Sequence, residues 1–445
     1  MSAAPIEIPA VGRAKPLKVP THTERTLRNG LRVMAVRRPT VPRVEMRLRI
    51  AAGTSMDNGD GARATMLPEV LLAGTSSRDS VEIARELQRL GASMEADADA
   101  DDLIVHGGVL TANLKGFFAL LAEVLRAPAF PKDEVSIARD RVAQEIIIQR
   151  SQPGAIAAEA FRGVVFGKHR YGRPRPAPEA VRRIGPSPIK RFFEQHVFPR
   201  GSTMVLVGDL QPAKAIDAVE SALGSWKGAG APARPASPQA VSPRGIVLID
   251  RPGAVQTTIR VGGPAVPRSH PDFFRVALGV MVFGGYFSSR LVKNIREDKG
   301  YTYSPSTLVD HKRGASTLIC QADVGTEVTA AALHEIRYEL GRMAAIAVPQ
   351  DELDQARRYL AGATSLSIQT QGGLAAYVDG LLTSGLDLGF LKAFRSNLEA
   401  VTPDEVYEAS TRYFAPRALH TVMVGDARVI APALQAFDDV EVRKA

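Results

Sequence analysis

Arg296 and Tyr303 are the residues of this sequence whose types and spacing best fit a chemical role. Both follow a glycine pair and an amphipathic run. We expect Ser288 or Ser289 to begin a helix there, because serine is favoured at helix N-termini. Gly300 should end that helix, since glycine often stands just past the last turn.

The apolar residues of this run recur at helical spacing and predict one buried face (Leu291, Val292 and Ile295). Arg296 then falls in the last helical turn, and Tyr303 falls a few residues into a following strand. A guanidinium and a phenol both donate hydrogen bonds, so the two could converge on a carbonyl oxygen. On these residues alone, an ordinary surface helix followed by a strand is the simpler interpretation.

A resemblance gives the pair more weight. The motif Ser-Ser-Arg-Leu, followed by Ile-Arg-Glu-x-Lys-Gly-x-x-Tyr-Ser, resembles the second-half signature of the pitrilysin/insulinase family of zinc peptidases. In that family the arginine and tyrosine bind the substrate backbone near the scissile bond. The resemblance therefore implies that Arg296 and Tyr303 bind peptide and stabilise the transition state, with no catalytic residue supplied by this chain alone.

The metal site of the family is broken in this sequence. An active member carries His-x-x-Glu-His on a first-half helix, where two histidines bind zinc and the glutamate activates a water. Here Thr65 replaces the first histidine, Pro68 the catalytic glutamate, and Glu69 the second histidine. Glu145 matches the third ligand. Two carboxylates cannot build a zinc site of this kind, so we expect no metal in this chain.

The other residues add no competing chemistry. The 8 histidines are scattered singly, and neither a nucleophile elbow nor a phosphate-binding loop is present. The net charge of +9 comes from basic residues interleaved with acidic ones, which favours an acidic partner or peptide over nucleic acid. The single cysteine, Cys320, reads as a core residue.

No apolar run is long enough to span a bilayer, and residues 1–20 lack the apolar core of a signal peptide. Whether a signal peptide was removed before Met1 stays undecided. We therefore expect a soluble protein of the bacterial cytoplasm or periplasm, with the compartment undecided.

The pattern of the first half restarts in the second. The segments around 130–134 and 198–209 recur around 348–352 and 414–426 at a near-constant offset, which predicts an internal duplication. Strands mixed with runs of helices indicate an α+β fold. The strands are expected at 31–36, 44–50, 93–98, 103–109 and 203–208, and the helices at 61–72, 81–90, 114–125, 133–150 and 187–195.

Composition sets the domain boundaries. Residues 1–22 read as an extended N-terminal arm, and residues 227–245 as a Pro/Ala-rich linker. The linker should join two homologous pitrilysin-like α+β domains that fold as separate units. These are residues 23–226, with the degenerate zinc site, and residues 246–445, with Arg296 and Tyr303.

The retained pair and the lost zinc ligands suggest divided labour. The resemblance implies a heterodimer, since the family includes pairs in which only one subunit holds His-x-x-Glu-His. Our hypothesis is that this chain is the non-zinc subunit and supplies Arg296 and Tyr303 to peptide cleaved at the partner's zinc. The alternatives are a non-catalytic scaffold or core subunit of a larger assembly, and a peptide-binding homodimer.

Overall fold

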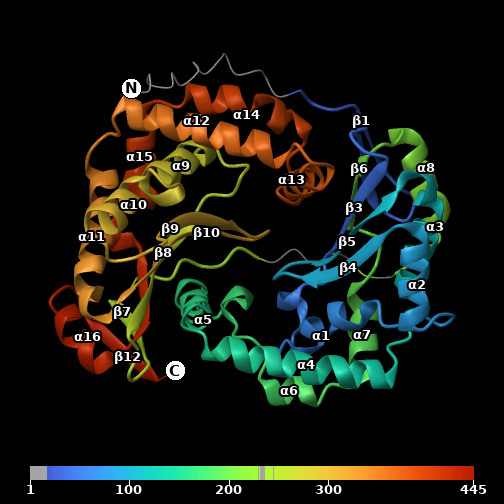
Figure 1. Ribbon diagram of the computed structural model, residues 1–445, viewed down its shortest axis with the longest axis horizontal. Coiled ribbons are helices and arrows are strands. Elements are labelled where there is room, and N and C mark those ends of the chain that lie inside the picture. The colour runs from blue at the N-terminus through green and yellow to red at the C-terminus, as the bar shows by residue number, and fades with distance from the viewer. Residues whose placement is uncertain (1–17, 229, 231–235, 244, 445) are drawn as a thin grey trace, which may run out of the picture.

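The computed structural model describes residues 18–228, 230, 236–243 and 245–444 (Figure 1). The first half contains β1 (His22–Thr26), β2 (Arg32–Arg37), β3 (Arg43–Ile50), α1 (Ala62–Leu71), α2 (Ser80–Leu90), β4 (Ser93–Ala98), β5 (Leu103–Leu110), α3 (Leu114–Arg126), α4 (Lys132–Ser151), α5 (Pro153–Phe166), α6 (Pro178–Arg182), α7 (Pro186–His196), β6 (Thr203–Gly208) and α8 (Pro212–Leu223).

The second half contains two short π-helices in addition to its regular elements. These are β7 (Ile246–Asp250), β8 (Gln256–Ala265), α9 (Phe273–Val280), the first π-helix (Met281–Gly285), α10 (Arg290–Val292), the second π-helix (Lys293–Asp298), β9 (Ser306–His311), β10 (Ser316–Gly325), α11 (Thr329–Ala345), α12 (Gln350–Ser367), α13 (Gln371–Thr383), α14 (Leu388–Ala400), α15 (Pro403–Tyr413), β11 (His420–Gly425), α16 (Ala427–Leu434) and β12 (Val440–Lys444).

The two halves repeat one sheet topology. Their six-stranded sheets have the orders β1-β2-β6-β3-β5-β4 and β12-β7-β11-β8-β10-β9. In each, a strand late in the half pairs in parallel with one neighbour and antiparallel with the other: β6 with β2 and β3, and β11 with β7 and β8. The predicted α+β class and internal duplication are confirmed. Only the outer edge differs, since β1 is antiparallel to β2 whereas β12 is parallel to β7.

The predicted helices and strands of the first half are present. The start of one helix and the end of the N-terminal arm need correction. The helix predicted from Ser187 begins at Pro186 after Gly185, because a proline already suits the first turn, so Ser187 does not cap it. His22 opens β1 and is not part of an arm. The rest of the predicted arm, up to residue 17, lies outside the described residues.

Both sheets are buried on both faces, as the continuous apolar character of their central strands requires. Side chains alternate along a strand, so Met204 and Leu206 of β6 join the core of the first half. Val205 and Val207 face the other way and pack against α13 and α14. The second sheet is built alike, with Val422 and Val424 of β11 packed against α5.

Each half therefore covers a face of the other half's sheet. In Figure 1, α13 reaches across from the second half to β3 and β6, and α5 lies beside the second sheet. The cores of the two halves are therefore shared, whereas the expectation that the halves fold as separate units stays a prediction. Helical periodicity showed that these helices have an apolar face, but not which sheet that face covers. The domain boundaries themselves stay a prediction.

The described part of the linker is irregular in conformation but held in place. The carbonyl oxygen of Ala236 lies 2.9 Å from Nε2 of His169, and that of Val241 lies 3.1 Å from Nε2 of the buried His420. Residues 236–243 are otherwise mostly exposed, and the linker over 227–245 stays a prediction.

Among the described residues, no single helix has the length and apolar character needed to cross a membrane. Helices α13 and α14 meet those criteria only when taken together, and they are bent by 93°. Most apolar residues of α13 are buried against the first sheet.

Candidate functional site

The segment that carries Arg296 is helical, as the sequence predicts. Ser289 precedes α10, which continues into the second π-helix at Lys293. Leu291, Val292 and Ile295 form its buried face. Gly300 follows at a φ of +65°, in the left-handed region that favours glycine, and so ends the helix.

The structure brings Arg296 and Tyr303 together. The guanidinium carbon of Arg296 lies 5.1 Å from the centre of the Tyr303 ring and 4.5 Å from that of Phe287. It is thus held by two aromatic rings, an arrangement stabilised by the attraction between a cation and a π-face. Nε of Arg296 also lies 3.3 Å from a carboxylate oxygen of Glu297. Sequence reasoning missed Phe287.

Tyr303 is not in a strand, which corrects the prediction. Thr302 makes a single bridge to Val324, and β9 begins only at Ser306. Pro305 stands between them and has no N–H to donate to a sheet, so regular pairing starts after it. Tyr303 is 82% exposed.

The residues at the position where the family holds zinc make local contacts of their own. Helix α1 starts after Gly61, whose φ is +85°, and the Thr65 hydroxyl donates to the Gly61 carbonyl at 2.9 Å. Pro68 is buried within the helix and has no side-chain donor or acceptor.

Arg141 of α4 joins the two remaining carboxylates. Its Nη2 lies 2.6 Å from Glu69, and its Nη1 lies 2.9 Å from Glu145. The hydrogen bond to Glu69 is the main reason that the pKa of Arg141 is raised above its usual value. A guanidinium thus links α1 and α4 through the carboxylates that would otherwise face a metal.

These residues do not fit zinc. One hydroxyl is bound to backbone, one position is proline, and both carboxylates are ion-paired with Arg141. Across the described ranges, no group of three or more histidine, cysteine, aspartate or glutamate side chains is placed to hold a metal ion. Arg141 was missed at the sequence level, although its spacing to Glu145 is that of a helical ion pair.

Two cavities adjoin these positions. One of about 820 Å³ is lined by Thr65, Glu69 and Glu145 together with residues of the segment 170–177. The other, of about 340 Å³, lies beside α10 and the second π-helix. The two cavities share no lining residue, and α1 and α10 are drawn apart in Figure 1. Arg296 and Tyr303 are not among the residues that line the cavity of Glu69 and Glu145.

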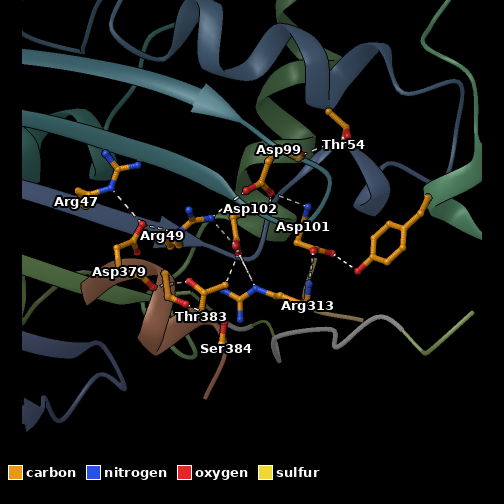
Figure 2. Close-up of polar contacts among 12 residues, drawn as sticks. Arg47, Arg49, Thr54, Asp99, Asp101, Asp102, Arg313, Asp379, Thr383 and Ser384 are labelled. Carbon is orange, nitrogen blue, oxygen red and sulfur yellow. Dashed lines mark hydrogen bonds and ion pairs between the residues drawn. The ribbon is translucent and has the colours of Figure 1, made fainter. Parts of the chain in front are cut away.

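A network of buried charges fixes the halves to one another (Figure 2). Asp379 of α13 accepts from Nε of Arg49 at 2.7 Å and from Nε of Arg47 at 3.1 Å, both on β3. Asp102, before β5, binds Arg313 of the second half at 2.8 Å and Arg49 at 3.2 Å. Burial raises the pKa of the Asp102 carboxyl, although the charge of Arg313 opposes that shift.

Comparison with known proteins establishes the family. Residues 32–179 match the family "Insulinase (Peptidase family M16)", and residues 184–360 match "Peptidase M16 inactive domain". The chain therefore belongs to the M16 peptidase family, which is the pitrilysin/insulinase family that its motifs resemble.

The most similar curated relatives carry names of zinc proteases. An uncharacterized zinc protease of Streptomyces coelicolor is 24% identical over 395 residues, which cover 86% of this chain and 84% of that protein. The uncharacterized zinc protease YmxG of Bacillus subtilis is 21% identical, over 78% of this chain and 84% of its own.

Solved structures share the fold. A peptidase M16 inactive domain from Pseudomonas fluorescens superposes with a TM-score of 0.84 at 22% identity, over 91% of this chain and 98% of that one. The periplasmic protease PqqL from Escherichia coli superposes with a TM-score of 0.77 at 15% identity, over 95% of this chain but only 50% of that chain.

Proposed function

We propose that this chain is the non-zinc subunit of a heterodimeric M16 peptidase. In this proposal Arg296 and Tyr303 bind a peptide that a homologous His-x-x-Glu-His subunit cleaves at its zinc. The observation that carries the proposal is the contrast between the two positions. The arginine and tyrosine are preassembled and reach solvent, whereas the two carboxylates left at the metal position are ion-paired with Arg141.

Pairing is supported by the size of one structural neighbour. The PqqL chain is about twice as long as the part that this chain superposes on, and its first half alone matches this chain. Within this chain the metal position is on α1 and α4 of the first half, whereas Arg296 is on the second π-helix of the second half. In this proposal a second subunit places a zinc site opposite the pair.

The pair offers donors for a negatively charged oxygen. Peptide hydrolysis at zinc passes through a tetrahedral intermediate, and preorganised donors lower its energy. Arg296 carries a permanent positive charge, and the Tyr303 hydroxyl is a donor. Because Phe287 and Tyr303 hold the guanidinium, little side-chain entropy is lost when it binds the oxygen.

The test uses this chain mixed with a co-purifying homologue that carries His-x-x-Glu-His. Arg296→Ala and Tyr303→Phe should each lower the turnover of a fluorogenic peptide by roughly 10²–10³-fold, the usual loss for one such donor. Arg428→Ala and Tyr359→Phe are matched controls on exposed residues outside the pair. They should leave turnover unchanged.

Assembly is measured in parallel by size-exclusion chromatography. The heterodimer should form with every variant, because a stable interface is far larger than two side chains. Unchanged cleavage by both pair variants with the dimer intact would favour a non-catalytic scaffold. Loss of the dimer would show that the two residues are structural.

A further inference from the structure

A cavity of about 360 Å³ lies in the second half, away from both positions described above. Its wall comes from α9, β9, α12, α13 and α14, and most of it is apolar (Val266, Phe273, Val276, Leu360, Phe390 and Phe394). Leu308 of the same lining is 45% exposed, so part of the wall reaches solvent. The volume is within the usual range of small-molecule sites.

One cation, Arg268, stands at the edge of this apolar wall. Among the described residues it has neither an ion pair nor a side-chain hydrogen bond, although most arginines of this chain have one. Its Nη1 lies beside Gly380 of α13, 3.2 Å from the place where a Cβ would stand. Burial lowers the pKa of Arg268, as expected for a charge without a carboxylate partner. Arg268 is partly buried, so its guanidinium could form a charge-assisted hydrogen bond with an anion that enters the cavity.

Two neutral groups lie next to Arg268. Burial raises the pKa of Tyr377 to about 12, so its hydroxyl stays protonated and can donate a hydrogen bond. Burial also lowers the pKa of His311 to about 4, with the charge of Arg268 adding to the shift, so that ring is neutral near pH 7. The polar edge therefore carries one positive charge and no negative one.

The polar cavity on the other side of Arg268 does not supply the missing anion. That cavity, of about 260 Å³, is lined by four carboxylates, and none of them forms an ion pair with Arg268. Asp101 accepts hydrogen bonds from the Tyr171 hydroxyl and the Arg313 backbone N–H. Asp99 and Asp102 bind Arg49 and Arg313, and Asp310 pairs with Lys312.

We propose that this cavity binds a small carboxylic acid with an apolar tail, such as a medium-chain fatty acid. The carboxylate accepts hydrogen bonds from Arg268 and Tyr377, and the tail lies along Phe273, Phe390 and Phe394. The charge excludes amines, and the aromatic wall excludes short acids, which bury too little apolar surface. This site is separate from the peptide-binding pair and does not depend on the function proposed above.

Isothermal titration of the full-length chain with decanoate tests the site. Decanoate should bind with one molecule per chain. 1-Decanol lacks the carboxylate and acetate lacks the long apolar tail, so each should bind at least about tenfold more weakly. An apolar peptide with a free C-terminal carboxylate is the second arm. Tighter binding of that peptide than of decanoate would overturn the assignment to a small acid.

Substitutions locate the binding. Arg268→Gln should weaken decanoate binding at least about tenfold, whereas Arg428→Gln, at an exposed arginine, should not change it. Ala277→Leu should also abolish binding, because Ala277 lines the cavity and the larger side chain fills it. If Arg268→Gln binds decanoate as well as the parent chain does, or if decanol binds equally well, the proposal is wrong. The ligand series decides the question even if a variant fails to fold.

Discussion

Replacing Asp379 by asparagine should lower the free energy of unfolding by about 3 kcal/mol. The Asp379 side chain is 1% exposed, and one of its oxygens accepts from both Arg47 and Arg49. Removing one member of a buried ion pair costs about 3–5 kcal/mol, because the remaining charge stays buried without a partner. Arg49 keeps Asp99 and Asp102, so we take the lower end of that range.

Urea unfolding followed by circular dichroism measures this loss. The matched control is Asp354→Asn, the same substitution in a 2.6 Å pair with Arg357 on a single helix, where the aspartate side chain is 40% exposed. An exposed pair contributes less than about 1 kcal/mol. If Asp379→Asn destabilises the chain no more than Asp354→Asn does, the charges between the halves do not hold them together and the reasoning fails.

Three further predictions follow from the fold and the site. Limited proteolysis should cut first within residues 236–240, which are mostly exposed. The two fragments should still co-elute on size-exclusion chromatography, because α5 and α13 each pack against the sheet of the other half. Separate peaks would contradict this. Lowering the pH from about 6.5 to 4 should lower the free energy of unfolding by about 3 kcal/mol through His311. The pKa of His311 is about 4 in the folded chain and higher in the unfolded chain, so over this range the unfolded chain binds the extra proton. His311→Gln should remove that slope in urea unfolding across this pH range. Metal analysis of the purified chain should find well below one zinc per chain, since Arg141 holds Glu69 and Glu145; stoichiometric zinc would contradict the assignment.

The sequence predicted the elements better than their packing. The helix over 133–150, the strand over 203–208 and the stop at Gly300 are local features, set by periodicity and by backbone preference, and the structure has them. The prediction that Tyr303 lies in a strand is wrong, because Pro305 cannot donate to a sheet and β9 begins only at Ser306.

Contacts between distant segments could not be predicted from one sequence. The ion pair between Arg141 and Glu69 joins two helices, and nothing in the sequence indicates it. The ion pair between Arg141 and Glu145 lies within α4 and can be predicted from the four-residue spacing. The docking of α13 on β6 is similar, since an apolar helix face is compatible with either sheet. The stacking of Phe287 on Arg296 depends on a loop conformation that no motif specifies.

The exchange of helices between the halves has a consequence for synthesis on the ribosome. All strands of the first sheet have been made by Gly208, but Val205 and Val207 stay uncovered until the α13–α14 segment, ending its contacts at Leu391, has emerged. At about 5–20 residues per second, this leaves an apolar face exposed for roughly 10–40 s. We expect ribosome-bound chains ending near residue 240 to be more sensitive to protease, and better chaperone clients, than chains that extend past α14.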